Sequence, residues 1–202
     1  DKAITVNFDG SSDMTFGALT ADTVNLDASG YLGAITDSNG AVVDAAIGTI
    51  TADTVVIKGS EIGANTFGSA ANAGNFITAD TLTYTGGLDV DTVYLTSKGA
   101  DTMNVSLDTG AGDDVVGLTA ISSTTKITVT GDMGGNNGDG ITVASSTSIN
   151  GININLSGLT GYSTSDLSAK AAGSALVGGS GVDSLTVGGA TAASAKGVLE
   201  YR

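Results

Sequence analysis

The sequence predicts an all-β protein, mainly a parallel β-solenoid or β-roll, with an elongated rather than a globular shape. Three observations support this fold class. The chain of 202 residues contains 31 Gly, no Pro and only 4% aromatic residues, yet 41% of its residues are hydrophobic. A short unit with one Asp and an alternating apolar tail recurs along the chain, and glycine-rich turns precede several copies. Small β-branched residues between tight turns are typical of many short strands.

The recurring unit predicts one strand per copy. Most copies read small residue, Asp, Thr or Ser, and then apolar–any–apolar. The eight copies are Ala21–Leu26, Ala52–Ile57, Ala79–Tyr84, Val90–Leu95, Ala100–Val105, Asp113–Leu118, Gly138–Val143 and Val182–Val187. The alternation indicates a strand with one buried face. So short a unit cannot bury that face alone, and we expect successive coils to stack and form the core together.

The spacing of the copies predicts the length of a coil. The Asp residues of the first three copies, Asp22, Asp53 and Asp80, are 31 and 27 positions apart, which fits a long coil of two or three strands. The gaps from Asp80 to Asp114 are only 10 to 13 positions, which fits half a coil.

Other segments complete the prediction. Further strands are expected at Ile4–Phe8, Met14–Leu19, Leu32–Thr36, Ile47–Thr51, Lys126–Thr130 and Ile152–Leu156. Turns are expected at Asp9–Asp13, Asp37–Gly40, Gly68–Asn75 and Gly131–Gly140. The one expected helix is Ser165–Leu176, with Ser165 as its N-cap. We divide the chain into residues 1–85 with Thr-Ala-Asp-Thr units, residues 86–143 with glycine-rich turns, and a C-terminal β segment at 144–202.

Composition excludes several function classes. Seven basic residues face 21 acidic ones, for a net charge of −14, so the chain would repel nucleic acids and anionic lipids. It has no Cys for disulfides and no apolar stretch long enough to insert directly into a membrane. It starts at Asp1 without a signal peptide, and we interpret it as a piece or processed form of a longer protein. The absence of His and Cys removes the commonest general base and a common nucleophile, so we expect no enzyme.

Several glycine-rich turns fit a calcium-binding nonapeptide, G-G-x-G-x-D-x-U-x, in which U is a large apolar residue. Residues 178–186 match every specified position, and residues 109–117 miss only the first Gly. Residues 86–94 and 134–142 have Asp89 and Asn137 in place of the third Gly, and both residue types tolerate a left-handed backbone.

The physical chemistry of these turns points to Ca²⁺. Glycines allow positive φ and bring carbonyl oxygens inward, and the Asp carboxylate can close a cage of about six to eight oxygens. The candidate metal ligands are Gly86, Asp89, Asp91, Asp101, Thr109, Ala111, Asp114, Asp139, Gly178, Ser180 and Asp183. The alternative is that Asp caps its own turn without a metal. We favour that structural role for Asp22, Asp53 and Asp80, whose Thr-Ala-Asp-Thr units lack preceding glycines.

These motifs resemble the RTX proteins over about residues 86–140 and 178–186. The resemblance implies export by type I secretion from Gram-negative bacteria and folding outside the cell into calcium-loaded parallel β-rolls. Members rich in Asp, Thr, Gly and Ala without Cys include surface-layer proteins. The chain departs from the family pattern because only Asp91, Asp101 and Asp114 approach tandem spacing, and Asp183 has no tandem neighbour.

The main hypothesis is an extracellular structural segment that self-assembles into a bacterial surface layer with calcium. A surface glycan such as lipopolysaccharide is a candidate anchor. The alternatives are an adhesin stalk or ligand-binding solenoid module, and a carbohydrate-active enzyme with such repeats. Regular T-x-T arrays on flat solenoids can also bind ice, and Thr83-Tyr84-Thr85 and Thr128-Val129-Thr130 have this pattern. In the sequence these T-x-T segments do not recur in register along many coils, which favours ordinary solvated strand faces.

Overall fold

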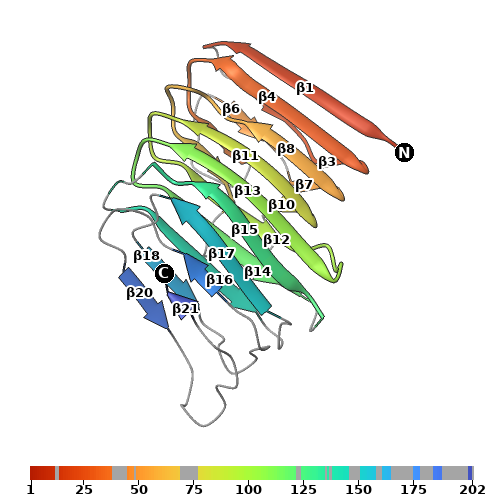
Figure 1. The fold of residues 1–202 in the computed structure, drawn as a ribbon. Helices are drawn as coiled ribbons and strands as arrows, with labels where there is room; N and C mark the ends of the chain where they lie inside the picture. Colours follow the sequence, from red (N-terminus) through yellow and green to blue (C-terminus); the bar gives the residue numbers. More distant parts are fainter. Residues whose placement is uncertain are drawn as a thin grey trace.

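A computed structural model of the chain is an all-β structure in which every strand pairing is parallel. It describes residues 1–11, 14–37, 45–47, 49–68, 77–121, 124–134, 136, 138–145, 151–157, 161–164, 175–177, 184–187 and 200–201. Within these residues the chain forms a β-solenoid, with coils stacked in sequence order from the N-terminus to the C-terminal strands (Figure 1).

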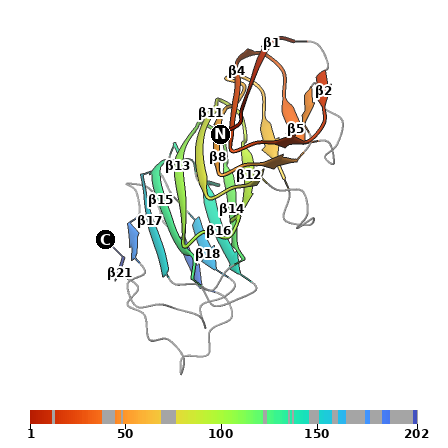
Figure 2. The same cartoon turned by 90° about the vertical axis from the view of Figure 1, so that its right-hand side faces the viewer.

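Two parallel sheets form the walls of the solenoid. The first sheet has the order β1-β4-β8-β11-β13-β15-β17-β19-β21, which follows the sequence. Its strands are β1 (Ala3–Gly10), β4 (Thr23–Tyr31), β8 (Thr54–Lys58), β11 (Thr81–Gly87), β13 (Thr102–Gly110), β15 (Lys126–Asp132), β17 (Gly151–Ser157), β19 (Ala175–Val177) and β21 (Glu200–Tyr201). The second sheet lies on the opposite side of the core (Figure 2). Its strands are β2 (Met14–Phe16), β3 (Leu19–Thr20), β5 (Ile35–Asp37), β6 (Ala45–Ile47), β7 (Ile50–Thr51), β9 (Asn65–Phe67), β10 (Ile77–Thr78), β12 (Thr92–Thr96), β14 (Val115–Ala120), β16 (Gly140–Ser145), β18 (Gly161–Thr164) and β20 (Ser184–Val187).

The register shows how the length of a coil varies. In the first sheet Thr23 pairs with Thr54, 31 positions later, whereas Thr81 pairs with Asn104, only 23 positions later. The difference lies in the second sheet. In the later coil, β12 is one strand that pairs with β9 at its start and with β10 at its end. The earlier coils divide this strand in two and place extra residues between the halves.

The core lies between the sheets and consists of columns of apolar side chains. One column follows the register through Val24, Val55, Leu82, Val105 and Val129, all at most 2% exposed. The second sheet contributes a facing column of Phe67, Val93, Val116 and Ile141. Each coil exposes its apolar face unless a neighbour covers it, so the coils stabilise one another.

Most predicted strands are present, with shifted bounds. The predicted strand at Met14–Leu19 is two short strands, β2 and β3, and the one at Leu32–Thr36 begins only at Ile35. The predicted helix at Ser165–Leu176 is wrong at its C-terminal end, because Ala175–Val177 is strand β19, which pairs with Asn153–Asn155. Residues 165–174 of the predicted helix lie outside the described part of the chain. The proposed divisions at 85/86 and 143/144 fall inside β11 and β16, and both sheets continue across them.

Candidate functional site

The copies of the Asp unit occupy two different corners of the coil. Asp22, Asp53, Asp80 and Asp101 stand directly before the first-sheet strands β4, β8, β11 and β13, and we call them the outer column. Asp91, Asp114 and Asp139 stand directly before the second-sheet strands β12, β14 and β16. Thr66 pairs with Thr92, so Asn65, one position before Thr66, occupies the place of Asp91 in the preceding coil. We call these four residues the buried column. The gaps of 10 to 13 positions are therefore half-coils, as predicted.

The buried column is a continuous hydrogen-bonded ladder along the solenoid axis. Its four side chains are at most 1% exposed. The backbone N–H of Asn65 donates to Asp91 Oδ1 at 3.0 Å, and the N–H of Asp91 donates to Asp114 Oδ1 at 2.8 Å. The N–H of Asp114 donates in turn to Asp139 Oδ1 at 2.9 Å. Each carboxylate thus satisfies the amide of the preceding coil, where the chain enters the second sheet and has no strand partner for that amide.

Asn65 begins the ladder with an amide instead of a carboxylate. Its Oδ1 accepts the N–H of Ser60 at 2.7 Å, and its Nδ2 donates to Asp91 Oδ1 at 2.8 Å and to the Ser60 carbonyl at 3.1 Å. The amide therefore adds a donor next to the first buried carboxylate. Asn65 is not among the residues predicted from the sequence, although Asn65-Thr66-Phe67 has the polar–Thr–apolar order of the other copies.

The Oδ2 atoms of the three aspartates in the buried column differ in their hydrogen bonds. Asp91 Oδ2 accepts the N–H of Gly87 at 3.3 Å, and Asp139 Oδ2 accepts the N–H of Asn136 at 2.6 Å. Asp114 Oδ2 is buried without a well-formed hydrogen bond from any described residue, although the Thr109 hydroxyl lies against this carboxylate. The middle carboxylate of the ladder is therefore the least well compensated.

The glycines of these turns leave room for the column. A Cβ atom on Gly86 would collide with the Asp91 carboxylate and with the carbonyl oxygen of Thr109. Gly110 has a φ of +86° and lies against the carbonyl of Gly87 in the coil before it. Larger residues at either position would push the stacked turns apart, which explains the Gly-Asp order of the motif.

Burial shifts the acidities of this region. It raises the pKa of Asp91 to about 6, although hydrogen bonds from Asn65 oppose the shift, and the charge of Asp114 adds to it. The pKa of Asp114 is raised by burial and by the neighbouring charges of Asp139 and Asp113. The pKa of the buried Tyr84 hydroxyl is raised well above its usual value by burial and by the charge of Asp91. Stacked carboxylates disfavour one another's charge and hold protons more tightly than free ones do.

The predicted metal ligands are not all brought together. Gly86, Asp89, Asp91, Thr109, Ala111, Asp114 and Asp139 lie at the same corner in three successive coils. Asp101 belongs to the outer column at the opposite corner. Gly178, Ser180 and Asp183 lie outside the described residues. Asp89 is exposed and its Oδ1 accepts the N–H of Val90 at 2.8 Å, which caps the turn. Asp89 does not adopt the left-handed backbone that its residue type tolerates, because no described residue other than Gly has a positive φ.

The buried column, as folded, does not fit a calcium cage. One oxygen of each Asp accepts a backbone N–H of the preceding coil, and Asp114 Oδ2 is the one carboxylate oxygen without a clear donor. Within the described residues no three acidic side chains form a group that could hold a metal ion. A Ca²⁺ ion takes about six to eight oxygens, more than this arrangement leaves open. Calcium at these turns stays a prediction.

The outer column consists of exposed and half-buried turn residues. Asp80 Oδ1 accepts the N–H groups of Lys98, Gly99 and Ala100 at 2.9 to 3.2 Å, and Asp22 Oδ2 accepts the N–H of Lys2 at 2.7 Å. The predicted structural role is confirmed for these two residues. Asp53 instead accepts a hydrogen bond from the Lys98 ammonium group.

The Thr-Ala-Asp-Thr unit is one corner of the coil. Its first Thr ends a short second-sheet strand, and its second Thr begins a first-sheet strand. Ala52 and Ala79 are fully buried in this corner, where their N–H groups donate to the coil that follows. The identical units therefore have a packing reason, because the buried corner position holds only a methyl group.

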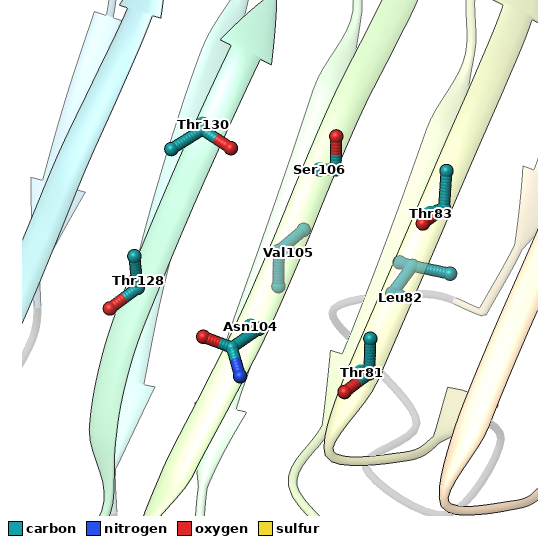
Figure 3. Close-up of a pocket in the computed structure, with 8 residues that line it drawn as sticks. All are labelled: Thr81, Leu82, Thr83, Asn104, Val105, Ser106, Thr128 and Thr130. Carbon is teal, nitrogen blue, oxygen red and sulfur yellow. The ribbon is translucent and has the colours of Figure 1, made fainter.

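The outward face of the first sheet is a second feature, and its regularity was not predicted from the sequence. Two rows of short side chains, polar at every position except Val56, run across the strands in register. One row contains Thr23, Thr54, Thr81, Asn104, Thr128 and Asn153, and the other contains Thr5, Asn25, Val56, Thr83, Ser106, Thr130 and Asn155. We call these rows the Thr/Asn face. A shallow hollow of about 120 Å³ lies between the rows on β11, β13 and β15, also lined by Leu82 and Val105 (Figure 3).

Comparison of the chain with family models, curated proteins and solved structures found no match. The described residues include no helix that could span a membrane.

Proposed function

We propose that the chain is a structural segment of a bacterial cell-surface protein that self-assembles into a surface layer, with calcium bridging acidic edges of neighbouring molecules. The observation that carries the proposal is the position of the charges. Stacking lines up the carboxylates of Asp22, Asp53 and Asp80 on successive coils, and Asp101 lies at the same corner of the next coil, two positions out of this register. On the other side of the coil, Asp9, Glu61, Asp89 and Asp113 are exposed. A rigid solenoid of this kind presents acidic edges at a fixed spacing.

Electrostatics supplies the reason for a divalent cation. Two copies with a net charge of −14 repel each other most strongly where acidic edges approach. Ca²⁺ prefers carboxylate oxygens and tolerates irregular geometry, so it can join two such edges, whereas Mg²⁺ demands tighter octahedral coordination. Asp101 suits this role because it is exposed and no described side-chain hydrogen bond engages its carboxylate.

The test is assembly of the full chain in calcium, in magnesium and in EGTA, followed by sedimentation and negative-stain electron microscopy. We expect sheets or ordered filaments in calcium and dispersed molecules in EGTA. Asp101→Asn should require more calcium for the same assembly. Asp108→Asn is the matched control, because it removes the same charge from an exposed residue of strand β13 rather than from the edge.

Three results separate the candidates. Assembly that is indifferent to EGTA would contradict the calcium mechanism. Isolated rods at high protein concentration in calcium would favour the adhesin stalk instead. Circular dichroism in the same buffers tests whether calcium also binds within a single molecule. A coil-to-β transition on addition of calcium would place the ion in the turns.

A further inference from the structure

The Thr/Asn face is a two-dimensional array rather than a single stripe. Along each strand its side chains alternate with core residues, so successive members are about 6.6–6.8 Å apart. Across the strands they repeat with the parallel pairing, about 4.7–4.9 Å apart. Thr81 and Thr83 on β11 lie beside Asn104 and Ser106 on β13, which lie beside Thr128 and Thr130 on β15 (Figure 3).

The pairing of the strands reveals a regularity that is not visible in the sequence. The T-x-T segments are separated by N-x-S at Asn104–Ser106, so the array appears interrupted in the sequence. The sheet pairs Thr83 with Ser106 and Ser106 with Thr130, so the polar row is continuous. Asn153 and Asn155 extend it by another strand beyond β15.

The composition of the face restricts its ligand. Neither row contains a charged residue, although the chain as a whole carries a net charge of −14. The neighbouring row, through Asp27, Lys58, Asp108 and Asp132, does carry charges. The two rows also contain no aromatic ring on which a sugar could stack. An uncharged face without aromatic rings fits neither a phosphorylated ligand nor a sugar ring.

The side chains are suited to an ordered, uncharged hydrogen-bonding partner. Thr is stiff at χ1, so its hydroxyl and methyl positions are largely set before binding. The side chains of Leu82 and Val105 point into the core, so the hollow between the rows is bordered by the hydroxyl, methyl and amide groups of the face itself. A partner that repeats in two directions and carries hydrogen-bonding oxygens at similar spacings would match every element of the array at once.

We propose that the Thr/Asn face binds ice, with crystalline water as its ligand. Hydroxyl and amide groups at the strand spacing hold water in a lattice-like layer, and the threonine methyl groups that border the hollow order the water between the rows. This inference is independent of the surface-layer proposal, because it uses the face and not the acidic edges.

The experiment measures inhibition of ice recrystallisation and thermal hysteresis with the full chain in calcium-containing buffer. We expect the wild-type chain to keep ice grains small and to shape single crystals. Ser106→Arg places a long charged side chain in the centre of the face and should abolish both effects. Thr142→Arg is the matched control, an exposed strand residue of the second sheet outside the Thr/Asn face, and should keep both.

Circular dichroism of each variant shows that loss of activity is not loss of fold. A second variant, Thr83→Arg, repeats the test on the neighbouring strand. An inactive wild-type chain would overturn the proposal, as would equal activity of Ser106→Arg and Thr142→Arg. Binding of the wild-type chain to crystalline cellulose or chitin without any effect on ice would assign the face to a polysaccharide surface and overturn the proposal as well.

Discussion

The buried column predicts that the folded chain is most stable in mild acid when calcium is absent. Asp91 has an ordinary pKa of 3.8 when unfolded, and burial raises its pKa to about 6 in the folded chain. The folded state therefore binds this proton more tightly than the unfolded state does. The resulting stabilisation is fully present below pH 3.8 and is lost as the pH rises through about 6.

The magnitude follows from the difference between the two pKa values. One pKa unit corresponds to about 1.4 kcal/mol, so the shift of Asp91 makes the free energy of unfolding about 3 kcal/mol smaller at neutral pH than below pH 3.8. Asp114 shifts in the same direction and adds to this loss.

The assay is urea unfolding in EGTA, followed by circular dichroism, at several pH values between 4 and 8. Asp91→Asn is the reference, because it removes the titrating group, and Asn65 shows that an amide fits this ladder. The difference between wild type and variant cancels the general repulsion among the other carboxylates. If that difference is constant across the pH range, burial of Asp91 does not control the stability of the corner and the reasoning is refuted.

Two further predictions concern the turns. Gly131 and Gly99 both have positive φ, but a Cβ atom on Gly131 would collide with the Leu107 carbonyl, whereas Gly99 faces open space. Thermal and urea unfolding should therefore find Gly131→Ala about 1–3 kcal/mol more destabilising than Gly99→Ala, and equal losses would contradict the collision. Asp80→Ala removes the acceptor of three N–H groups and should cost about 1 kcal/mol by the same measurement, because those donors turn to water. Asp101→Ala should cost less, and a larger loss there would show that its carboxylate is engaged.

The sequence pattern alone was sufficient for the architecture. The apolar–any–apolar tails of Val55–Ile57 and Val93–Leu95 require strands with one buried face, because alternation places those residues on one side of a pleated chain. Their short length and repetition require stacking. The half-coil spacing between Asp80 and Asp91 also followed from the sequence, since each coil passes through two corners.

The tertiary structure decided what the same local unit does at each corner. Asp80 and Asp91 have similar neighbours in the sequence, yet one is a half-buried turn cap and the other lies inside a ladder of carboxylates. Their difference depends on the coils above and below, which a local pattern does not encode. The same is true of the Thr/Asn face. Its members are 20 to 31 positions apart in the sequence, and only the pairing of the strands brings them side by side. Local chemistry determined the strands and turns of this protein, and stacking determined which of their side chains meet.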